Sequence, residues 1–297
     1  MSVSCKMISV VTPFYKGNRY INELISNVNE VAAQLLQETD TKMELIVVND
    51  SPDVPVEISV DSQIPVTVLE NPQNLGIHGS RINGIRHAQG DWIQMLDQDD
   101  LLIPEQYLHS VRLCDQADVV VGNCYYYHGD NKQLLYRSEA AMNYLIRQDR
   151  FLSIRNLIAS PGHCLVKKAA LPAFWMENPM MVNGADDYYL WVLMFHQQYK
   201  FANNPAPVYI HRNSEEGNLS FDLAKMYRSC EEMCQLLEAC PEFPANKLSK
   251  LRRSVLFKYL YDTHQLSAED WLNYADKVFD NVIYKIVTCI TGRITSR

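Results

Sequence analysis

The sequence GDWIQMLDQDD, residues 90–100, decides the fold class of this chain. Its apolar part, residues 92–96, predicts a short buried strand that runs directly into Asp97, Asp99 and Asp100. Alternate residues of an extended chain point to the same side, so the Asp97 and Asp99 carboxylates can converge. Carboxylates this close repel one another, and a divalent cation such as Mg²⁺ or Mn²⁺ is the simplest partner that makes the cluster favourable. The alternative is an acidic turn before the next helix, with Asp100 as a solvated cap.

Strands and helices alternate on the N-terminal side of this stretch. Residues 7–15, 45–48 and 66–69 predict three strands, and residues 20–35 carry apolar side chains at helical spacing. Each predicted strand ends in polar or acidic residues. Ligands of open α/β sheets bind outside the carboxyl ends of parallel strands, so these ends should build a single pocket. The fold class expected from the residues is therefore α/β.

Six segments in this order resemble the inverting glycosyltransferases of family 2, which have the GT-A fold. The matching segments are residues 9–15, 47–51, 74–85, 88–93, 96–104 and 184–191. The resemblance is continuous from about residue 6 to residue 110 and patchy to about residue 220. It implies a GT-A type, Rossmann-like mixed sheet flanked by helices, with a catalytic domain over residues 1–220 and a C-terminal helical region over residues 221–297.

Composition agrees with a cytoplasmic enzyme. Hydrophobic residues make up 47% of the chain, which is enough for a large core, and no long apolar run predicts a transmembrane span. The N-terminus lacks a signal-peptide pattern, and the eight scattered cysteines are typical of reduced thiols in a cytosolic protein. The net charge of −8 argues against a nucleic-acid partner. Residues 241–297 hold nine Lys or Arg and six Asp or Glu, a balance of +3, so residues 1–240 carry −11. So acidic a region should bind a nucleotide diphosphate only when a cation accompanies it.

The resemblance assigns the nucleotide to the ends of the first strands. It implies that Thr12, Pro13 and Phe14 cradle the base, with Phe14 as a stacking face; the alternative is that Phe14 belongs to the core. Asp50 occupies the position of the family's acid that reads the base, and its acceptor-only carboxylate suits the N3–H of uracil. The alternative for Asp50 is a turn-forming residue. Arg81 aligns with an arginine near the nucleotide, and the alternative is a surface helix arginine.

The resemblance also assigns the reacting groups. Asp97 and Asp99 form the D-x-D pair, of which one contacts the ribose and the other the metal; the division between them stays open. Asp186 and Asp187 open a helix, and in this family the second acid of such a pair deprotonates the acceptor hydroxyl. Their alternative role is to cap that helix. The sequence departs from the family at Asp186, where glutamate is usual, and at Met194, where an arginine often ends the helix.

Two histidines and an arginine complete the predicted site. His163 lies in a segment that resembles the acceptor side, and the alternative is a structural histidine. His211 and Arg212 precede a polar loop that in many relatives forms a lid over the diphosphate. His211 is the candidate metal ligand there and Arg212 the candidate phosphate contact, against the alternative that both are simply exposed.

Amphipathic spacing predicts three helices between residues 223 and 286. No acidic residue follows Asp280, whereas Lys285, Arg293 and Arg297 do. Such an end could lie as a peripheral contact on an anionic membrane. The alternative is a helix that packs on the catalytic domain or on a second subunit in a homo-oligomer.

The function expected from all of this is a metal-dependent, inverting glycosyltransferase that uses Mn²⁺ or Mg²⁺. It would move a sugar from a nucleotide-diphospho-sugar, preferably a UDP-sugar, to a hydroxyl of a glycan or lipid-linked acceptor in polysaccharide biosynthesis, in the cytoplasm or at the inner face of the membrane. One alternative is a sugar nucleotidyltransferase, which shares the fold but normally needs a Gly-rich loop after the first strand. Another is a non-catalytic subunit that binds nucleotide sugars or glycans, against which the intact Asp97, Asp99 and Asp187 speak.

Overall fold

The computed structural model describes residues 5–128, 131–212 and 222–290, and the chain forms two compact units. The sheet unit comprises residues 1–135, 160–181 and 199–213, and the helical unit comprises residues 136–159, 182–198 and 214–297. The sequence predicts a single boundary near residue 220. The two units are instead interleaved along the chain, because the helical unit also takes two segments that precede this position.

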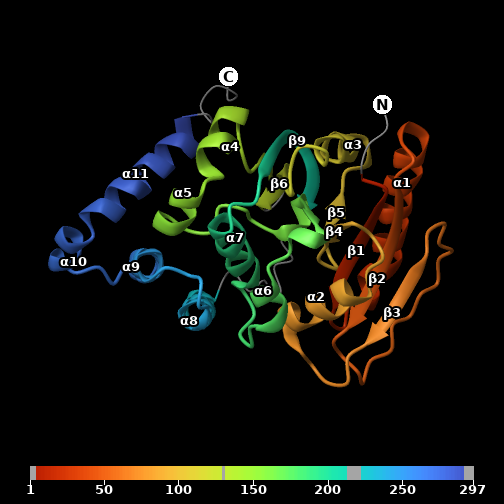
Figure 1. The fold of residues 1–297 in the computed structure, drawn as a ribbon, viewed down its shortest axis with the longest axis horizontal. Coiled ribbons are helices and arrows are strands. Elements are labelled where there is room, and N and C mark those ends of the chain that lie inside the picture. The colour runs from red at the N-terminus through yellow and green to blue at the C-terminus, as the bar shows by residue number, and fades with distance from the viewer. Residues whose placement is uncertain (1–4, 129–130, 213–221, 291–297) are drawn as a thin grey trace. The chain divides into compact units, whose positions relative to one another are not determined.

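The sheet unit is built on one mixed sheet (Figure 1). Among the described residues its strand order is β3-β2-β1-β4-β8-β6-β9-β5, with β7 beside β6. The strands are β1 (Met7–Phe14), β2 (Lys42–Asn49), β3 (Val66–Glu70), β4 (Trp92–Met95), β5 (Leu101–Leu102), β6 (Val119–His128), β7 (Asn131–Leu134), β8 (Cys164–Lys167) and β9 (Phe201–His211). The pairs within β1 to β4 are parallel, as is β6 with β9, and the remaining pairs are antiparallel. The predicted α/β fold with a mixed sheet is confirmed.

Helices cover both faces of the β1–β2 region. Helices α1 (Asn18–Glu38) and α3 (Pro104–Leu113) share one core with alternate strand residues such as Val10 and Leu45. Helix α2 (Gly76–His87) packs on the intervening strand residues, because a Cβ on Gly84 would lie 2.4 Å from Val11 Cγ1. Val10 and Val11 point to opposite faces of β1, so α1 and α2 lie on opposite sides of the sheet. The short helices η1 (Pro161–His163), η2 (Lys168–Ala170) and α6 (Ala173–Glu177) complete this unit.

The parallel strands place their carboxyl ends at one edge of the sheet. In register, Phe14 pairs with Asn49, Asn49 with Glu70, and Val11 with Met95. The acidic residues that follow β2 and β4 therefore emerge at the same edge. This is the arrangement that the polar strand ends in the sequence predict.

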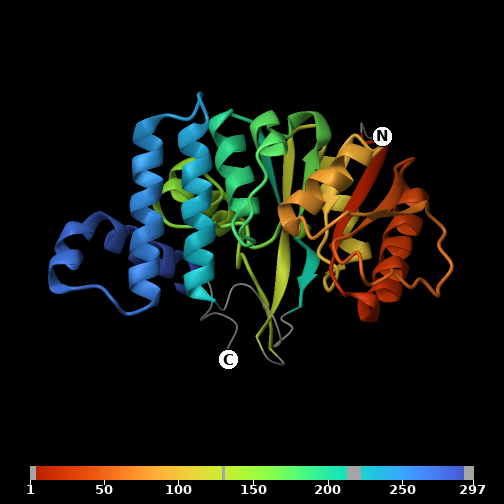
Figure 2. The ribbon, with the colours of Figure 1, turned by 90° about the horizontal axis from the view of Figure 1, so that it is seen from below.

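The helical unit consists of helices in its described residues. They are α4 (Glu139–Leu145), α5 (Gln148–Ser153), α7 (Asp186–His196), α8 (Leu223–Ala239), α9 (Ala245–Asp262), α10 (Ala268–Asn273) and α11 (Ala275–Ile290). Helices α7, α8 and α9 run side by side (Figure 2). The three helices expected near the C-terminus correspond to α8, α9 and α11. Over the residues described, none of the helices is long and apolar enough to cross a membrane.

Candidate active site

Asp97 lies just beyond β4 and is paired with a buried arginine. The Leu96 N–H donates to the Val11 carbonyl (3.0 Å), which keeps the chain aligned with β1 up to the acidic segment. Arg81 of α2 is 4% exposed, and its Nη2 lies 2.7 Å from Asp97 Oδ1. Burial raises the pKa of the Asp97 carboxyl, and the Arg81 guanidinium opposes this shift. The alternative of a surface arginine at position 81 is therefore wrong.

Asp100 is a buried acceptor that joins the end of β4 to the end of β9. It is 1% exposed and accepts from the Tyr209 hydroxyl, from His211 Nδ1 (3.0 Å) and from the Arg212 backbone N–H (2.6 Å). An ionised carboxylate only accepts, so Nδ1 of His211 carries the proton in this arrangement. Helix α3 has Ile103 as its N-cap and no capping side chain. The alternative of an acidic turn with Asp100 as a solvated cap is therefore wrong.

Asp99 lies between these two anchored carboxylates. Burial raises its pKa to about 6, and the negative charges of Asp100 and Asp97 add to the shift. A carboxylate with a raised pKa costs free energy when it is ionised at neutral pH, and a cation beside it would remove that cost. The donor set at the end of β4 thus fits a hard divalent cation that prefers oxygen ligands.

The cation would need further ligands from outside this cluster. No group of three or more His, Cys, Asp or Glu side chains surrounds a common point in the part of the chain that the structure describes. Mg²⁺ and Mn²⁺ sites commonly use one or two carboxylates and complete the shell with substrate phosphates and water. Asp97 and Asp99 are the two carboxylates that would supply ligands to a site of that kind.

His211 and Arg212 are both held in place rather than simply exposed. Burial lowers the pKa of His211, but its hydrogen bond to Asp100 and the charges of Asp100, Asp97 and Asp99 outweigh this, so the pKa is raised overall. The Arg212 guanidinium binds the Glu23 carboxylate of α1 with two hydrogen bonds, of 3.1 and 2.9 Å, and also donates to the Asp99 carbonyl.

Burial changes the interpretation of the first strand. Phe14 is 1% exposed and belongs to the core shared with α1. Phe14 is therefore a core residue, as the alternative interpretation of the sequence had it, and its ring is not open to a base in this conformation. Pro13 is half-buried, and Thr12 is fully buried with no hydrogen-bond partner for Oγ1 among the described residues.

Tyr15 is the aromatic residue that sequence reasoning missed at this strand end. It is 49% exposed, and its backbone N–H and C=O pair with the side chain of Gln98 at 2.9 and 3.3 Å. Gln98 separates the two aspartates of the D-x-D, so this loop is tied directly to the acidic segment. A Cβ on Gly17 would lie 2.3 Å from Gln98 Oε1, so the close approach requires glycine. Strand alternation predicts that the side chains of Phe14 and Tyr15 point to opposite sides, but it does not show which of the two faces the core.

Asp50 holds the loop that leads into α2. It is 4% exposed and accepts from Asn71 Nδ2 (2.8 Å), the Leu75 N–H (2.6 Å) and the Gly76 N–H (2.9 Å). These bonds fix the start of the helix that carries Arg81. A carboxylate has about four acceptor positions, so one further hydrogen bond from a ligand is compatible with this geometry.

The acid pair of α7 lies in the helical unit and is buried. Asp186 is 4% and Asp187 8% exposed. Asp187 Oδ2 accepts from Asn156 Nδ2 (2.9 Å) and Oδ1 from the Tyr188 N–H (2.6 Å). The N-cap of α7 is Ala185, so neither acid is the cap, although both lie in the first turn. Asn156 orients Asp187, and no motif in the sequence marks it.

The loop before α7 is fixed against α8. The Ala185 N–H donates to Ser229 Oγ (3.0 Å), and this hydroxyl donates to the Val182 carbonyl (2.8 Å). Gly184 has φ +139°, and a Cβ there would lie 2.7 Å from Met226 Sδ. A side chain at position 184 would be strained for both reasons. Helix α8 therefore sets the position of the acid pair.

His163 is part of a buried turn beside β6 and β9. It is 1% exposed, and its Nδ1 lies 2.7 Å from the Gly122 carbonyl. Burial lowers its pKa to about 4, so the ring is neutral at physiological pH. This geometry favours the structural alternative for His163.

The structure thus gathers most of the predicted donor residues within the sheet unit. Direct contacts with one another or with Asp100 connect five of these residues, namely Arg81, Asp97, Asp99, His211 and Arg212. Asp186 and Asp187 belong to the helical unit. The sequence could not predict the partners of Asp100, because they lie more than 100 positions away.

Comparison with known families gives a match over most of the sheet unit. A family model described as glycosyl transferase family 2 matches residues 9–175. An uncharacterized glycosyltransferase of Haemophilus influenzae is 31% identical over 110 residues, which are 37% of this chain and 35% of that protein. Glycosyltransferase GlyG of Streptococcus pneumoniae is 32% identical over 129 residues, 41% of this chain and 40% of that protein. The matches therefore span little more than a third of the length of these curated relatives.

Solved structures show the same fold at low sequence identity. Staphylococcus aureus TarS in complex with UDP-GlcNAc has a TM-score of 0.56 and 14% identity, covering 95% of this chain and 81% of that one. The mannosyltransferase PcManGT of Pyrobaculum calidifontis, solved with GDP-Man and Mn²⁺, has a TM-score of 0.50 and 15% identity, covering 99% and 90%. These likenesses confirm the predicted GT-A fold.

The raised pKa of Asp99 predicts opposite effects of two neighbouring substitutions on the stability of the metal-free protein. At neutral pH the Asp99 carboxylate is ionised, which lowers the free energy of unfolding because its pKa is higher in the folded state than in the unfolded one. Below pH 4 the carboxyl is protonated in both states, so this destabilisation disappears. Asp99→Asn should therefore raise the melting temperature at pH 7.5 by a few degrees, equivalent to about 1–2 kcal/mol after allowance for solvent exposure, with no gain at pH 4. Asp100→Asn should lower it at pH 7.5, because a buried acceptor of three hydrogen bonds is disrupted.

Melting curves in EDTA at the two pH values test this prediction. If Asp99→Asn and Asp100→Asn lowered the melting temperature at pH 7.5 by similar amounts, the ionised Asp99 carboxylate would stabilise the fold, and the prediction would be wrong.

Proposed function

The chain belongs to glycosyltransferase family 2, and we propose that it is a metal-dependent, inverting enzyme that transfers a sugar from a nucleotide-diphospho-sugar, preferably a UDP-sugar. The observation that carries this proposal is the acidic segment after β4. There Asp99 has its pKa raised to about 6 beside two carboxylates that other residues already hold. An acidic surface of this kind suits a phosphate ligand only when a cation accompanies it.

On the donor side, Asp99 is the proposed metal ligand, and Asp97 contacts the metal or the ribose. Mn²⁺ or Mg²⁺, when bound, supplies charge neutralisation for the diphosphate leaving group. Asp100 accepts the hydrogen bond from the protonated Nδ1 of His211, which leaves the other ring nitrogen as the candidate ligand. Arg212 is the candidate phosphate contact, and Asp50 the acceptor for the base. The nucleotide sugars seen in TarS and PcManGT, and the Mn²⁺ in PcManGT, support this assignment.

On the acceptor side, Asp187 is the proposed general base. The acceptor hydroxyl oxygen attacks the anomeric carbon, its proton passes to Asp187, and the bond from that carbon to the diphosphate oxygen breaks with inversion. Asn156 holds one carboxylate oxygen of Asp187, which limits the orientations that the base can take. Asp186, which lies beside it in the first turn of α7, would support the base rather than take the proton itself.

The proposed acceptor is a glycan or a lipid-linked hydroxyl in polysaccharide biosynthesis, in the cytoplasm or at the inner membrane face. Family membership favours sugar transfer over the nucleotidyltransferase alternative. A non-catalytic binding subunit would gain nothing from a buried base that a second residue orients, so the contact between Asn156 and Asp187 argues against that alternative.

Nucleotide binding should depend on a divalent ion. Calorimetry should show UDP binding in the presence of Mn²⁺ and much weaker binding in EDTA, because the acidic segment repels a free diphosphate. Asp99→Ala should remove most of the Mn²⁺-dependent gain. Glu38→Gln is the matched control, since it removes an exposed carboxylate of α1 that lies outside the acidic segment and contacts none of its residues. Equal UDP–Mn²⁺ affinity in wild type, Asp97→Ala and Asp99→Ala would rule out the proposed metal site.

Removal of the general base should separate catalysis from binding. Asp187→Asn keeps the size of the side chain, so UDP–Mn²⁺ affinity and melting temperature should change little, while kcat falls by about two orders of magnitude or more. Asp186→Asn should have the smaller effect. Nucleotide release from a panel of nucleotide sugars, with glycan and membrane fractions as acceptors, measures the rate. Near-normal turnover by Asp187→Asn, or greater damage from Asp186→Asn, would refute the assignment of Asp187.

A further inference from the structure

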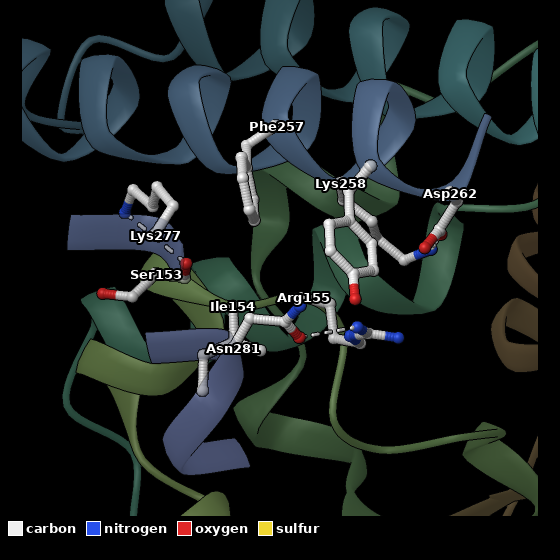
Figure 3. Close-up of a pocket in the computed structure, with 9 residues that line it drawn as sticks. Ser153, Ile154, Arg155, Phe257, Lys258, Asp262, Lys277 and Asn281 are labelled. Atoms are coloured by element: carbon white, nitrogen blue, oxygen red, sulfur yellow. Dashed lines mark hydrogen bonds and ion pairs between the residues drawn. The ribbon is translucent and has the colours of Figure 1, made fainter. Parts of the chain in front are cut away.

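A small pocket of the helical unit lies between α5, α9 and α11 (Figure 3). Its lining includes three cationic side chains, Arg155, Lys258 and Lys277, and one carboxylate, Asp262. Three positive charges against one negative leave a formal charge of +2. Figure 3 shows Arg155, Lys258 and Asp262 toward one end of the pocket and Lys277 toward the other. The open space is about 10 Å³ for the centre of a water-sized group, so it suits the charged end of a ligand rather than a whole sugar.

Arg155, in the segment after α5, is the lining cation that has no carboxylate partner. It is half-buried, its Nη2 donates to Asn281 Oδ1 of α11 at 3.5 Å, and its Cζ lies 4.8 Å from the centre of the Tyr284 ring. Its Nε is buried and forms no hydrogen bond with any residue that the structure describes. A half-buried guanidinium with an unsatisfied N–H costs free energy, and an oxyanion bound to it would remove that cost.

The carboxylates beside this pocket do not serve as that anion. Lys285 of α11 adds a further positive charge, because its Nζ lies 2.5 Å from the Tyr261 hydroxyl, and Tyr261 lines the pocket. The acids of α9 and α11 near the lining residues pair with other cations: Asp262 with Lys258, Asp276 with Arg253 (2.7 Å), and Asp280 with Arg150 (3.7 Å). The described part of the helical unit thus leaves Arg155 without a counter-ion.

The pocket adjoins the proposed general base. Arg155 immediately precedes Asn156, whose Nδ2 donates to Asp187 Oδ2 at 2.9 Å, and consecutive Cα atoms are only about 3.8 Å apart. Burial raises the pKa of the Cys230 thiol on α8 to about 12, and the charges of Lys258 and Asp187 act on this same thiol in opposite directions. Both ends of the comparison place the cations and the base in one region of the helical unit.

We propose that Arg155 binds an oxyanion of the acceptor, a phosphate or a carboxylate, while Asp187 takes the proton of the acceptor hydroxyl. The planar guanidinium suits either group, because it can donate two parallel hydrogen bonds to an oxyanion. Lys258 and Lys285 add positive potential around it. The role in the acceptor rests on the proposed sugar transfer, whereas the anion site itself can be measured without transfer.

Saturation-transfer nuclear magnetic resonance on the intact chain in EDTA tests the anion site without a donor or a metal. Glucose 6-phosphate and glucuronate carry the two candidate oxyanions, and glucose is the neutral reference. At least one of the acids should bind about tenfold more tightly than glucose, because charge-assisted hydrogen bonds are the strong ones. The acid that binds identifies the oxyanion. Failure of both acids to bind more tightly than glucose would overturn the proposal.

Three variants locate the bound anion. Arg155→Gln should weaken binding of the acid about tenfold or more, and Arg155→Lys, which keeps the charge but not the planar fork, should weaken it less. Asn281→Ala is the matched control, since it removes the same contact with α11 but keeps the guanidinium, and it should bind as wild type does. Arg212→Gln should also bind normally, since Arg212 belongs to the sheet unit. Melting temperatures check that each variant is folded.

Two results with these variants would contradict the proposal. Equal losses in Arg155→Gln and Asn281→Ala would make Arg155 a structural anchor of α11. A loss in Arg212→Gln with none in Arg155→Gln would assign the anion to the sheet unit.

A transfer assay separates this proposal from that of sugar transfer itself. With a donor that supports transfer, Arg155→Gln should raise KM for an anionic acceptor about tenfold or more, while kcat and UDP–Mn²⁺ affinity stay near wild type. Asp187→Asn should lower kcat instead. An unchanged KM in Arg155→Gln would overturn the role of Arg155 in the acceptor site. Anion binding at Arg155 without transfer from any donor would refute the sugar transfer, and the acceptor role with it, but not the anion site.

Discussion

The candidate donor site depends on the buried carboxylate of Asp100. Its two oxygens accept from the end of β9, a strand that lies three places from β4 in the sheet order. If Asp100 lost its donors, a buried charge would remain unpaired, at a cost of several kcal/mol. Burial is the main cause of the raised pKa of Asp99, and the charge of Asp100, which these hydrogen bonds hold close by, raises it further. Asp100 and Asp99 are thus adjacent carboxylates with opposite contributions to the stability of the fold.

A second chain of contacts reaches the same segment from the other side. Asp50 fixes the backbone at the start of α2, α2 carries the buried Arg81, and Arg81 binds Asp97. Gln98 meanwhile binds the loop after β1, so three strand ends are linked through single side chains. Such linkage limits the conformations of the acidic segment before any ligand arrives, which reduces the entropy lost on binding.

The sequence predicts the parts of this arrangement that depend on local pattern. Apolar runs that end in acids identify the strands and the edge where they meet, and the order of segments identifies the family. Side-chain direction at the end of a strand is harder to predict, since Phe14 and Tyr15 are adjacent aromatics and only packing against α1 decides which one is buried. The partners of Asp100 and Asp187 could not be found, because they come from remote segments without a motif. The burial of Lys277 and Asn281 on α11 likewise depends on contacts with Ser153 and Arg155 that no helical periodicity reveals.

The interleaving of the two units has a consequence for how this chain could have been assembled. The loop that positions Asp187 rests on Ser229 and Met226 of α8, and α5 packs against α9. The helices beyond residue 222 therefore cannot be a module appended to a finished enzyme, because removing them would leave the acid pair without its support. An ancestor that lacked these helices would have needed another scaffold for Asp186 and Asp187. Shuffling of the C-terminal region between relatives would therefore exchange the surface that holds the acid pair.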